Sequence, residues 1–505
     1  MKYIIALDIG TSSMRAILYN GKGESVASFG HEYHAVYPQP SWVEQDPDSW
    51  KRAAVDVLLR TADFMKDQGY TAEGIALTSQ RSSLIPVDST GNPLRDAIMW
   101  QDKRTLEQCE NLIREYGMEH LYRLTGLRIN PYFVLPKIRW FREYEPELYK
   151  RMWKVLGVQD YLVYCLTGEY ATDYTQAGRT MLMNIQKFQW EEDLLRIAGI
   201  GAEQLPRLVP PGTAVGRLTP DFASLTGLAS GLPVVISGGD QQNAAVALGV
   251  TEAGIAEANT GTGSFVLAYA EKPQFDASCR ALVQASAIAG KWVIEAGIFN
   301  TGSIYRWFKE QYCPDLTDVP KPYVKMDEEA MAVGPGSHGV LMIPHFEGSA
   351  APYWNPLAKG LFFNLSLGTT RGDMNRAILE GIAMEINGCL ELMQELLGPL
   401  TTVNVSGGMV KSDLFCRIQA SFYDKPVVRY QNSEASSLGA SMVAAPALGL
   451  YNSLQDSVKA MSPEVDMVFH PQPKDRIAAE KLISVKKKLY GALADSHVYE
   501  QFMGL

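Results

Sequence analysis

The chain has 505 residues, of which 46% are hydrophobic and 20% are charged, and its formal net charge is -10. This length exceeds one compact core and predicts two domains, and the composition excludes a disordered or fibrous protein. The negative net charge argues against a nucleic-acid partner. The six cysteines are scattered and do not have the spacing of a metal site. No apolar run is long enough to span a membrane. We therefore expect a cytoplasmic protein without nucleic-acid or membrane partners.

The first predicted elements are two strands, over residues 3–7 and 14–19, joined by the turn Asp8-Ile9-Gly10-Thr11-Ser12-Ser13. The apolar start of the chain is interpreted as a strand and not as a signal sequence. Hydroxyls and backbone N–H groups in such a turn suit nucleotide phosphates, and the carboxylate of Asp8 suits hydrated Mg²⁺. The same residue types also form ordinary polar turns.

The elements that follow alternate between helices and strands, which indicates an α/β fold. They are helices over 49–69 and 104–117, strands over 74–78 and 234–237, and a helix over 243–250. Asp240 stands where the second of these strands gives way to a helix, with Gly238 and Gly239 before it. Phosphoryl transfer to an alcohol requires a positioned base, so Asp240 is the candidate catalytic residue, although an Asp here could simply cap the helix.

Three short stretches of the first half combine hydrogen-bonding side chains with flat aromatic rings. They are Gln80-Arg81-Ser82, Trp100-Gln101-Asp102 and Asn130-Pro131-Tyr132-Phe133. Such mixtures suit a hydroxylated ligand, although each aromatic residue taken alone is more often a core residue.

The second half contains an echo of the first turn. Asn259-Thr260-Gly261-Thr262-Gly263-Ser264 is followed by an apolar strand, as Asp8–Ser13 is. This echo predicts one phosphate-binding hairpin in each half, placed on opposite sides of a cleft. Later predicted elements are strands over 339–343 and 403–405 and helices over 371–397 and 475–494.

The most specific stretch is Phe346-Glu347-Gly348-Ser349-Ala350-Ala351-Pro352-Tyr353-Trp354, followed by Thr369-Thr370-Arg371 and 376–381. It resembles a signature of the FGGY family of carbohydrate kinases, and the resemblance extends over nearly the whole chain. Residues 100–105, 125–133, 172–185 and 238–242 are most similar to glycerol kinases, and 40–47 to xylulose kinases. The resemblance implies two actin-like (ribonuclease H-like) ATPase domains around a central cleft: residues 1–246 on the substrate and metal side, and 247–505 on the nucleotide side.

The resemblance also implies a function: ATP-dependent phosphorylation, with Mg²⁺, of a hydroxyl on a small sugar or polyol such as xylulose or a glycerol-like compound. The implied substrate residues are Arg81, Ser82, Trp100, Tyr132, Asp240, Gln241 and Phe265. The implied nucleotide residues are Thr11, Ser12, Ser13, Arg15, Thr262, Thr301, Gly302, Gly408 and Ser412, and those facing the metal are Asp8 and Asp240. Asp240 is again the base, and a homodimer or another homo-oligomer is expected.

One position departs from the glycerol kinase pattern, because Arg81 is followed by Ser82 where those enzymes carry Glu. Losing a charge-assisted acceptor typically costs about 1.5–3 kcal/mol, and serine leaves more space. A longer ligand, such as a pentulose, hexulose or larger polyol, is therefore expected. The alternatives are a catalytically inactive sugar sensor and a chaperone-like or filament-forming ATPase on a related fold. The presence of Asp8 and Asp240 favours the kinase.

Overall fold

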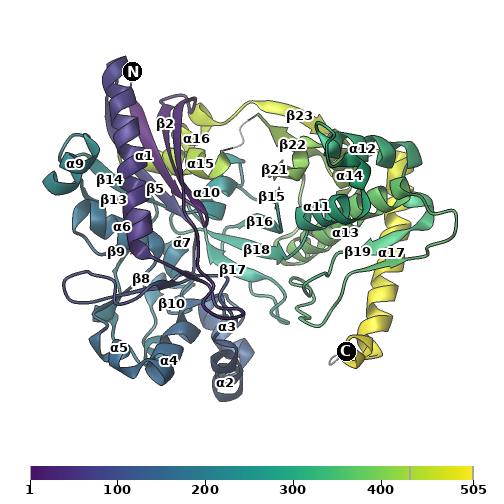
Figure 1. Cartoon of the computed structure of the whole chain (residues 1–505), viewed down its shortest axis with the longest axis horizontal. Coiled ribbons are helices and arrows are strands. Elements are labelled where there is room, and N and C mark those ends of the chain that lie inside the picture. Colours follow the sequence, from purple (N-terminus) through teal and green to yellow (C-terminus); the bar gives the residue numbers. More distant parts are fainter. Residues whose placement is uncertain (1, 432–433, 503–505) are drawn as a thin grey trace.

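A computed structural model describes residues 2–431 and 434–502. Two sheets lie side by side, one in each half of the chain, and helices cover their outer faces (Figure 1). Within the described residues, no helix has both the length and the apolar character required to cross a membrane.

The first sheet has the strand order β13-β14-β5-β1-β2-β3. Its strands are β1 (Tyr3–Ile9), β2 (Ser13–Asn20), β3 (Ser25–Glu32), β5 (Ala72–Ser79), β13 (Thr213–Arg217) and β14 (Pro233–Gly239). β1 pairs antiparallel with β2 and parallel with β5, and β5 pairs parallel with β14. The carboxyl ends of β1, β5 and β14 therefore meet at one edge, which brings Asp8 and Asp240 to the same part of the molecule.

The second sheet has the order β17-β18-β16-β15-β21-β22-β23. Its strands are β15 (Ile255–Thr260), β16 (Ser264–Ala270), β17 (Leu282–Ala285), β18 (Trp292–Ile298), β21 (Thr402–Ser406), β22 (Val427–Tyr430) and β23 (Val465–Phe469). The series β18-β16-β15-β21-β22 repeats the strand directions of β3-β2-β1-β5-β14. The β15–β16 turn thus occupies the position that the β1–β2 turn has in the first sheet, and the predicted pair of hairpins is confirmed.

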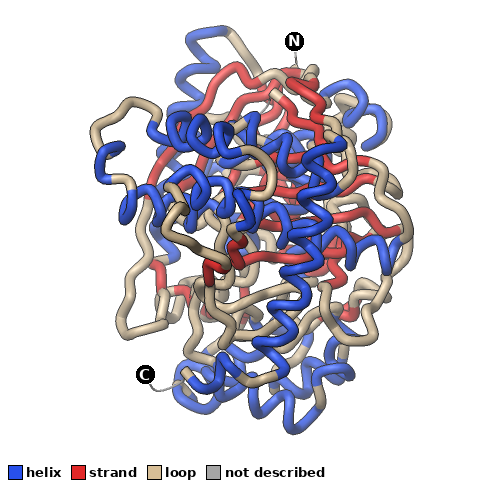
Figure 2. Tube along the Cα trace, turned by 90° about the vertical axis from the view of Figure 1, so that its right-hand side faces the viewer, coloured by secondary structure: helices blue, strands red, loops and turns tan. Residues whose placement is uncertain are grey.

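Long amphipathic helices flank the sheets. They include α1 (Pro47–Gln68), α2 (Leu106–Tyr116), α12 (Pro322–Val333), α13 (Arg371–Leu397), α14 (Asp413–Tyr423) and α17 (Pro473–Asp495). The Asp46 side chain accepts a bond from the first turn of α1, and Gly69 ends that helix in the left-handed conformation. Thr370 and Asp373 form a capping box at the start of α13. Figure 2 shows α17 crossing the outer face of the second half towards the C-terminus.

Two helices pack between the halves: α10 (Asp240–Ala247) and α15 (Ala435–Ala444). α15 comes from the second half, yet it packs on α10 and on β1, β5 and β14 of the first sheet. Its buried partners include Ile4, Ala76 and Val235. The predicted helix over 243–250 begins earlier, at Asp240, and ends before Gly249, whose φ is 76°. The predicted domain division at 246/247 lies within α10 and stays a prediction.

Candidate active site

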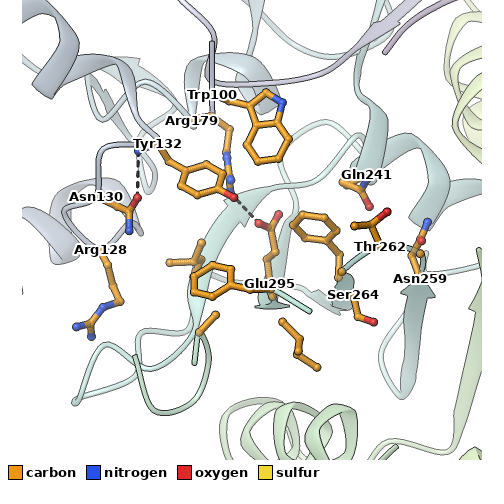
Figure 3. A pocket seen from close by; sticks show the side chains of 18 of the residues that line it. Trp100, Arg128, Asn130, Tyr132, Arg179, Gln241, Asn259, Thr262, Ser264 and Glu295 are labelled. Carbon is orange, nitrogen blue, oxygen red and sulfur yellow. Dashed lines mark hydrogen bonds and ion pairs between the residues drawn. The ribbon is translucent and has the colours of Figure 1, made fainter. Parts of the chain in front are cut away.

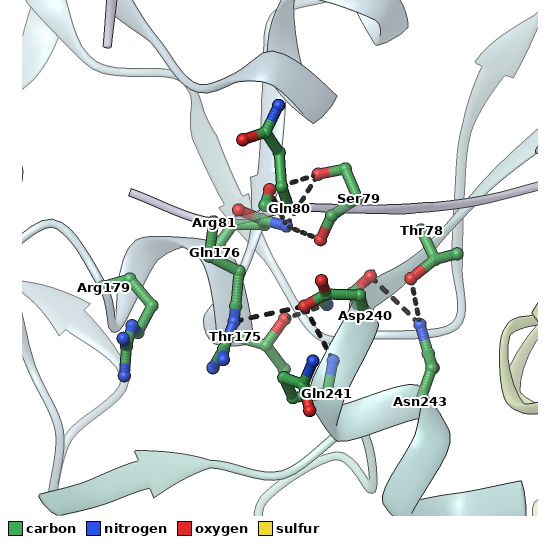
Figure 4. Close-up of polar contacts among 12 residues, drawn as sticks. Thr78, Ser79, Gln80, Arg81, Thr175, Gln176, Arg179, Asp240, Gln241 and Asn243 are labelled. Carbon is green, nitrogen blue, oxygen red and sulfur yellow. Dashed lines mark hydrogen bonds and ion pairs between the residues drawn. The ribbon is translucent and has the colours of Figure 1, made fainter. Parts of the chain in front are cut away.

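Asp240 is the first residue of α10 and follows β14 directly. Its Oδ1 accepts a hydrogen bond from the Gln241 backbone N–H at 2.8 Å and lies 3.5 Å from Arg81 Nε (Figure 4). Gly239 makes this approach possible, because a Cβ at that position would lie 2.5 Å from Arg81 Cδ. Burial raises the pKa of Asp240, and the positive charge of Arg81 opposes the rise. The side chain is still 27% exposed, so a ligand hydroxyl can reach it.

Arg81 is also held from the other half of the molecule. Its Nη1 lies 3.0 Å from Glu295 Oε2, and Arg179 Nη1 lies 2.7 Å from Glu295 Oε1. Burial alone would raise the pKa of Glu295, but the two guanidinium groups lower it to about 2. These three buried side chains form an ionic link between the two halves of the chain, since Glu295 belongs to β18 of the second sheet.

A cavity of about 350 Å³ opens beside this link (Figure 3). Of the predicted substrate residues, it is lined by Trp100, Tyr132, Gln241 and Phe265. The Trp100 and Tyr132 ring centroids are 5.1 Å apart, and Trp100 Nε1 donates a hydrogen bond to Thr11 Oγ1 at 3.1 Å. The remaining lining includes Arg128, Asn130, Phe133, Arg179, Glu295 and Trp354. Apolar ring faces with a few fixed polar groups are typical of a small-molecule binding site.

Three predicted substrate residues, Arg81, Ser82 and Asp240, are not among the residues that line this cavity. The backbone of Ser82 has a φ of 71°, and its carbonyl oxygen accepts a hydrogen bond from the buried Lys137 Nζ at 2.8 Å. Its side chain instead borders a separate internal cavity of about 20 Å³, with Asp160 and Thr172 among the neighbours. A backbone conformation of this kind reverses the direction of the side chain, which sequence reasoning could not foresee.

The turn after β1 is tight, and the corresponding turn of the second sheet has the same backbone hydrogen bond. The Gly10 N–H donates to the Ser13 carbonyl at 2.9 Å, and in the second hairpin the Gly261 N–H donates to the Gly263 carbonyl at 2.9 Å. Burial, together with the charge of Asp240, raises the pKa of Asp8 to about 7. The charge of Asp240 acts on Asp8, so the two carboxylates are electrostatic neighbours. Arg15 Nη1 makes an ion pair with Glu434 Oε1 at 2.6 Å.

A second cavity, of about 610 Å³, is lined by the second half of the chain. Of the predicted nucleotide residues, Thr262, Gly302, Gly408 and Ser412 line it. Thr301 lies behind the wall, where its Oγ1 donates to the Gly261 carbonyl at 3.2 Å and supports the hairpin. Thr11 and Ser12 lie in the β1–β2 turn, and Ser13 and Arg15 lie in β2. None of these four residues lines this cavity. The two cavities share Gly261 and Thr262, so they meet at the second hairpin.

Sequence reasoning missed several residues that the fold brings to these cavities. Glu295 and Arg179 are the main ones beside the smaller cavity, and Asp327 and Lys411 line the larger one. One signal was available for Glu295, because it is the only charged residue in the apolar strand Trp292–Ile298. A lone carboxylate in a buried strand is costly unless it is paired.

Residues 3–247 match the N-terminal domain of the FGGY family of carbohydrate kinases, and residues 256–448 match its C-terminal domain. The chain belongs to this family. This FGGY kinase is 28% identical to a xylulose kinase of Bacillus subtilis, over 97% of each chain. It is 33% identical to a glycerol kinase of Thermococcus gammatolerans, over 93% of this chain and 94% of that one. The crystal structure of Plasmodium falciparum glycerol kinase with ADP superimposes with a TM-score of 0.89 at 25% identity, covering 97% of this chain and 98% of that one.

These findings confirm the predicted family, the two-domain α/β fold and the kinase activity on a sugar or polyol with ATP. The resemblance to both glycerol and xylulose kinases is confirmed as well. The alternative of a catalytically inactive sugar sensor finds no support among them.

Proposed function

We propose that this FGGY kinase transfers the γ-phosphoryl group of ATP to a hydroxyl of an open-chain ketose or polyol longer than glycerol, with Asp240 as the base. The main observation behind this proposal is that the two cavities meet at Gly261 and Thr262. Gln241, which directly follows Asp240 in the chain, lines the smaller of them. A volume of 350 Å³ corresponds to about a dozen water-sized groups, which suits a sugar of five or six carbons better than a three-carbon polyol.

The site residues divide into three roles in this proposal. Asp240 accepts the proton of the attacking hydroxyl, and Arg81 favours the ionised form of Asp240 in a partly buried position. Gln241 and Asn130 supply polar contacts to hydroxyls, while Trp100, Tyr132 and Phe265 form apolar walls that exclude water. Thr262 and Gly302 face the phosphates from the second hairpin, and Gly408 with Ser412 lines the far part of the nucleotide cavity.

Magnesium fits this site. Asp8 and Asp240 supply two carboxylates, and Mg²⁺ is commonly held by one or two carboxylates plus water and nucleotide phosphates. Among the described residues there is no cluster of three or more acidic, His or Cys side chains that would form an all-protein cage. When bound, the ion would offset charge on the transferred phosphoryl group. The homo-oligomeric assembly expected from the sequence stays a prediction.

The test is a coupled ADP-release assay of the purified chain with ATP, Mg²⁺ and a panel of pentuloses, hexuloses, linear polyols and glycerol. We expect ADP release that depends on the added sugar, with kcat/KM highest for a chain of five or six carbons. A folded protein that releases no ADP with any compound would contradict the proposed activity. A preference for glycerol would contradict the proposed substrate length.

A further inference from the structure

The two residues before Asp240 are both glycine, so this part of the backbone has little conformational restraint of its own. Gly238 has a φ of 120°, and the pairing of β14 with β5 shifts register between Ile236 and Gly238. The position of Asp240 at the start of α10 therefore depends on groups that hold the Gly238–Gly239 segment from outside.

Two side chains hold the peptide group between Gly238 and Gly239, one at each of its polar atoms. Its N–H donates to Thr175 Oγ1 at 2.7 Å. Its carbonyl accepts from Asn243 Nδ2 at 3.0 Å. Figure 4 shows Asp240 between Thr175 and Asn243. Because the N–H and C=O of a trans peptide point in opposite directions, the two contacts together fix the rotation of this peptide plane, which directly precedes Asp240.

Asp173 sets the direction of the Thr175 hydroxyl. Thr175 belongs to the short helix α7 (Tyr174–Ala177), and Asp173 is the N-cap of that helix. Thr175 Oγ1 donates to Asp173 Oδ1 at 2.5 Å, and the Thr175 N–H donates to the same oxygen at 2.8 Å. Since a hydroxyl has one proton, its donation to Asp173 leaves Thr175 Oγ1 as the acceptor for the Gly239 N–H.

Asp173 is fully buried, and the groups that donate hydrogen bonds to it are neutral. Its Oδ2 accepts from Gln159 Nε2, in α6 (Val158–Thr167), at 2.6 Å. Burial raises the pKa of Asp173, and the hydrogen bonds from Thr175 and Gln159 oppose the rise. A buried carboxylate is costly unless its oxygens are hydrogen-bonded. Both oxygens of Asp173 are, and one of them holds the Thr175 hydroxyl in a single orientation.

We propose that Thr175 is a positioning residue for the base: its hydroxyl, oriented by Asp173, fixes the Gly238–Gly239 peptide and so directs the Asp240 carboxylate at the substrate hydroxyl. The proposal rests on the function proposed above, in which Asp240 is the base. Thr175 lines neither the smaller nor the larger cavity, so it acts on the reaction through the backbone and not by contact with a ligand.

The experiment compares Thr175→Val, which keeps the shape of the side chain without the hydroxyl, with Thr175→Ser, which keeps the hydroxyl. We expect kcat of Thr175→Val to fall about tenfold, because one hydrogen bond to a buried backbone group is lost. The KM for sugar and the calorimetric Kd for ADP should change by less than about twofold, because the cavity linings are intact. Thr175→Ser should bring kcat back to within about threefold of wild type.

Thr61→Val is the matched control. Thr61 is also fully buried, and its Oγ1 donates to the Val57 carbonyl at 2.7 Å within α1. It lines neither cavity, so this variant should keep the wild-type kcat.

A double variant tests the route of the effect. In the Asp240→Asn background, Thr175→Val should lower kcat no further, because the carboxylate that Thr175 positions is already absent. A second loss of about tenfold in that background, or a wild-type kcat in the single Thr175→Val variant, would overturn the inference.

Amide hydrogen exchange separates this inference from the kinase proposal, because it needs no activity. If no compound supports ADP release, the proposed function fails. The Gly239 amide should nevertheless be protected in the wild-type protein and should exchange about tenfold or more faster in Thr175→Val. An unprotected Gly239 amide in the wild-type protein would overturn the inference, even if Thr175→Val did not fold.

Discussion

At the scale of single residues, the chemistry of the site depends on how Asp240 is surrounded. Burial favours its protonated form, whereas a base must be ionised when the hydroxyl arrives. Arg81 opposes the effect of burial, and Glu295 fixes the position of Arg81 from the other sheet. Gly239 is required for this arrangement, since any side chain there would displace Arg81.

Asp240→Asn keeps the size of the side chain and removes its basicity. We expect kcat to fall by about 10²–10⁴-fold while nucleotide binding is retained, because a general base contributes about that factor. Steady-state ADP release and calorimetric ADP binding measure the two quantities. Asp221→Asn, at an acidic residue in the first turn of helix α9 (Pro220–Thr226), is the control and should remain active. Near-normal turnover by the Asp240 variant would remove this residue from the mechanism.

At the scale of elements, the two halves are joined by the crossing of α10 and α15. The crossing is close at Gly439, where a Cβ would lie 1.8 Å from the Asn243 carbonyl oxygen. Small residues on both helices allow this approach, so their sequences are rich in Ala, Gly and Ser. Since Asp240 begins α10, the contact also supports the position of the proposed base.

Gly439→Ala is expected to destabilise the protein by about 1–3 kcal/mol, because the added methyl group forces the two helices apart. Gly388→Ala is the matched control, as Gly388 is a helical glycine in α13 whose Cβ would meet open space. That change should be neutral or stabilise by up to about 1 kcal/mol. Urea unfolding monitored by circular dichroism gives both values, and equal effects of the two changes would contradict the close crossing.

A second contact between elements joins α13 to α17 through a buried ionic group. Lys486 Nζ lies 2.6 Å from Glu385 Oε2, and His345 Nε2 lies 2.9 Å from Glu385 Oε1. Lys486 Nζ also donates to Tyr353 OH at 3.1 Å. Because His345 and Tyr353 flank the segment that carries Ala350, this group connects α17 with the wall of the smaller cavity.

This group gives a pH dependence of stability. Burial would raise the pKa of Glu385, but Lys486 and His345 lower it to about 2, below its ordinary value of 4.5. A lowered carboxylate pKa stabilises the fold above pH 4.5, and the stabilisation is lost as the pH falls towards 2. Glu385→Gln should therefore cost about 3–5 kcal/mol at neutral pH, where Lys486 is left unpaired, and should flatten the loss of stability across that acidic range. Urea unfolding at pH 6 and at pH 3 tests both; a parallel loss in wild type and variant would contradict this role.

At the scale of the whole molecule, the site exists only where the two halves meet. The first half contributes Asp8 from β1 and Asp240 from the start of α10, and the second sheet contributes the hairpin that is shared by both cavities. Arg81 and Arg179 bind Glu295 across this boundary. Residues of both halves line the smaller cavity, so we expect a sugar bound there to favour the arrangement in which the phosphoryl group and the hydroxyl are aligned.

Hydrolysis of ATP by water should consequently be slow without sugar. We expect sugar-free ADP release to be about 100-fold or more below the sugar-dependent rate, because water is not positioned against the phosphoryl group. Parallel assays with and without substrate measure the ratio. Rapid sugar-independent release by a preparation free of contaminating ATPase would contradict this view.

Much of the fold could be predicted from local patterns. The helix expected over 371–397 is α13 with the same bounds, and the strand expected over 234–237 lies within β14. Local sequence was also enough to identify Asp240, the two Gly/Thr/Ser turns and the 346–354 signature, because each depends on a short contiguous segment. The start of α10 was placed three residues late, since Asp240 and the two Gln residues after it gave no apolar periodicity.

The sequence by itself determined the family, the paired hairpins and the candidate base, because these depend on the order and spacing of residues that are close together in the chain. Only the tertiary structure decided that Glu295 binds Arg81, 214 residues away in the chain, and that the side chain of Ser82 lies outside the smaller cavity. It also decided that Arg128 lines the smaller cavity, where its Nη1 donates a hydrogen bond to the Cys279 carbonyl. Pairing of charges and the direction of side chains depend on long-range packing between the two sheets, which short sequence patterns do not encode.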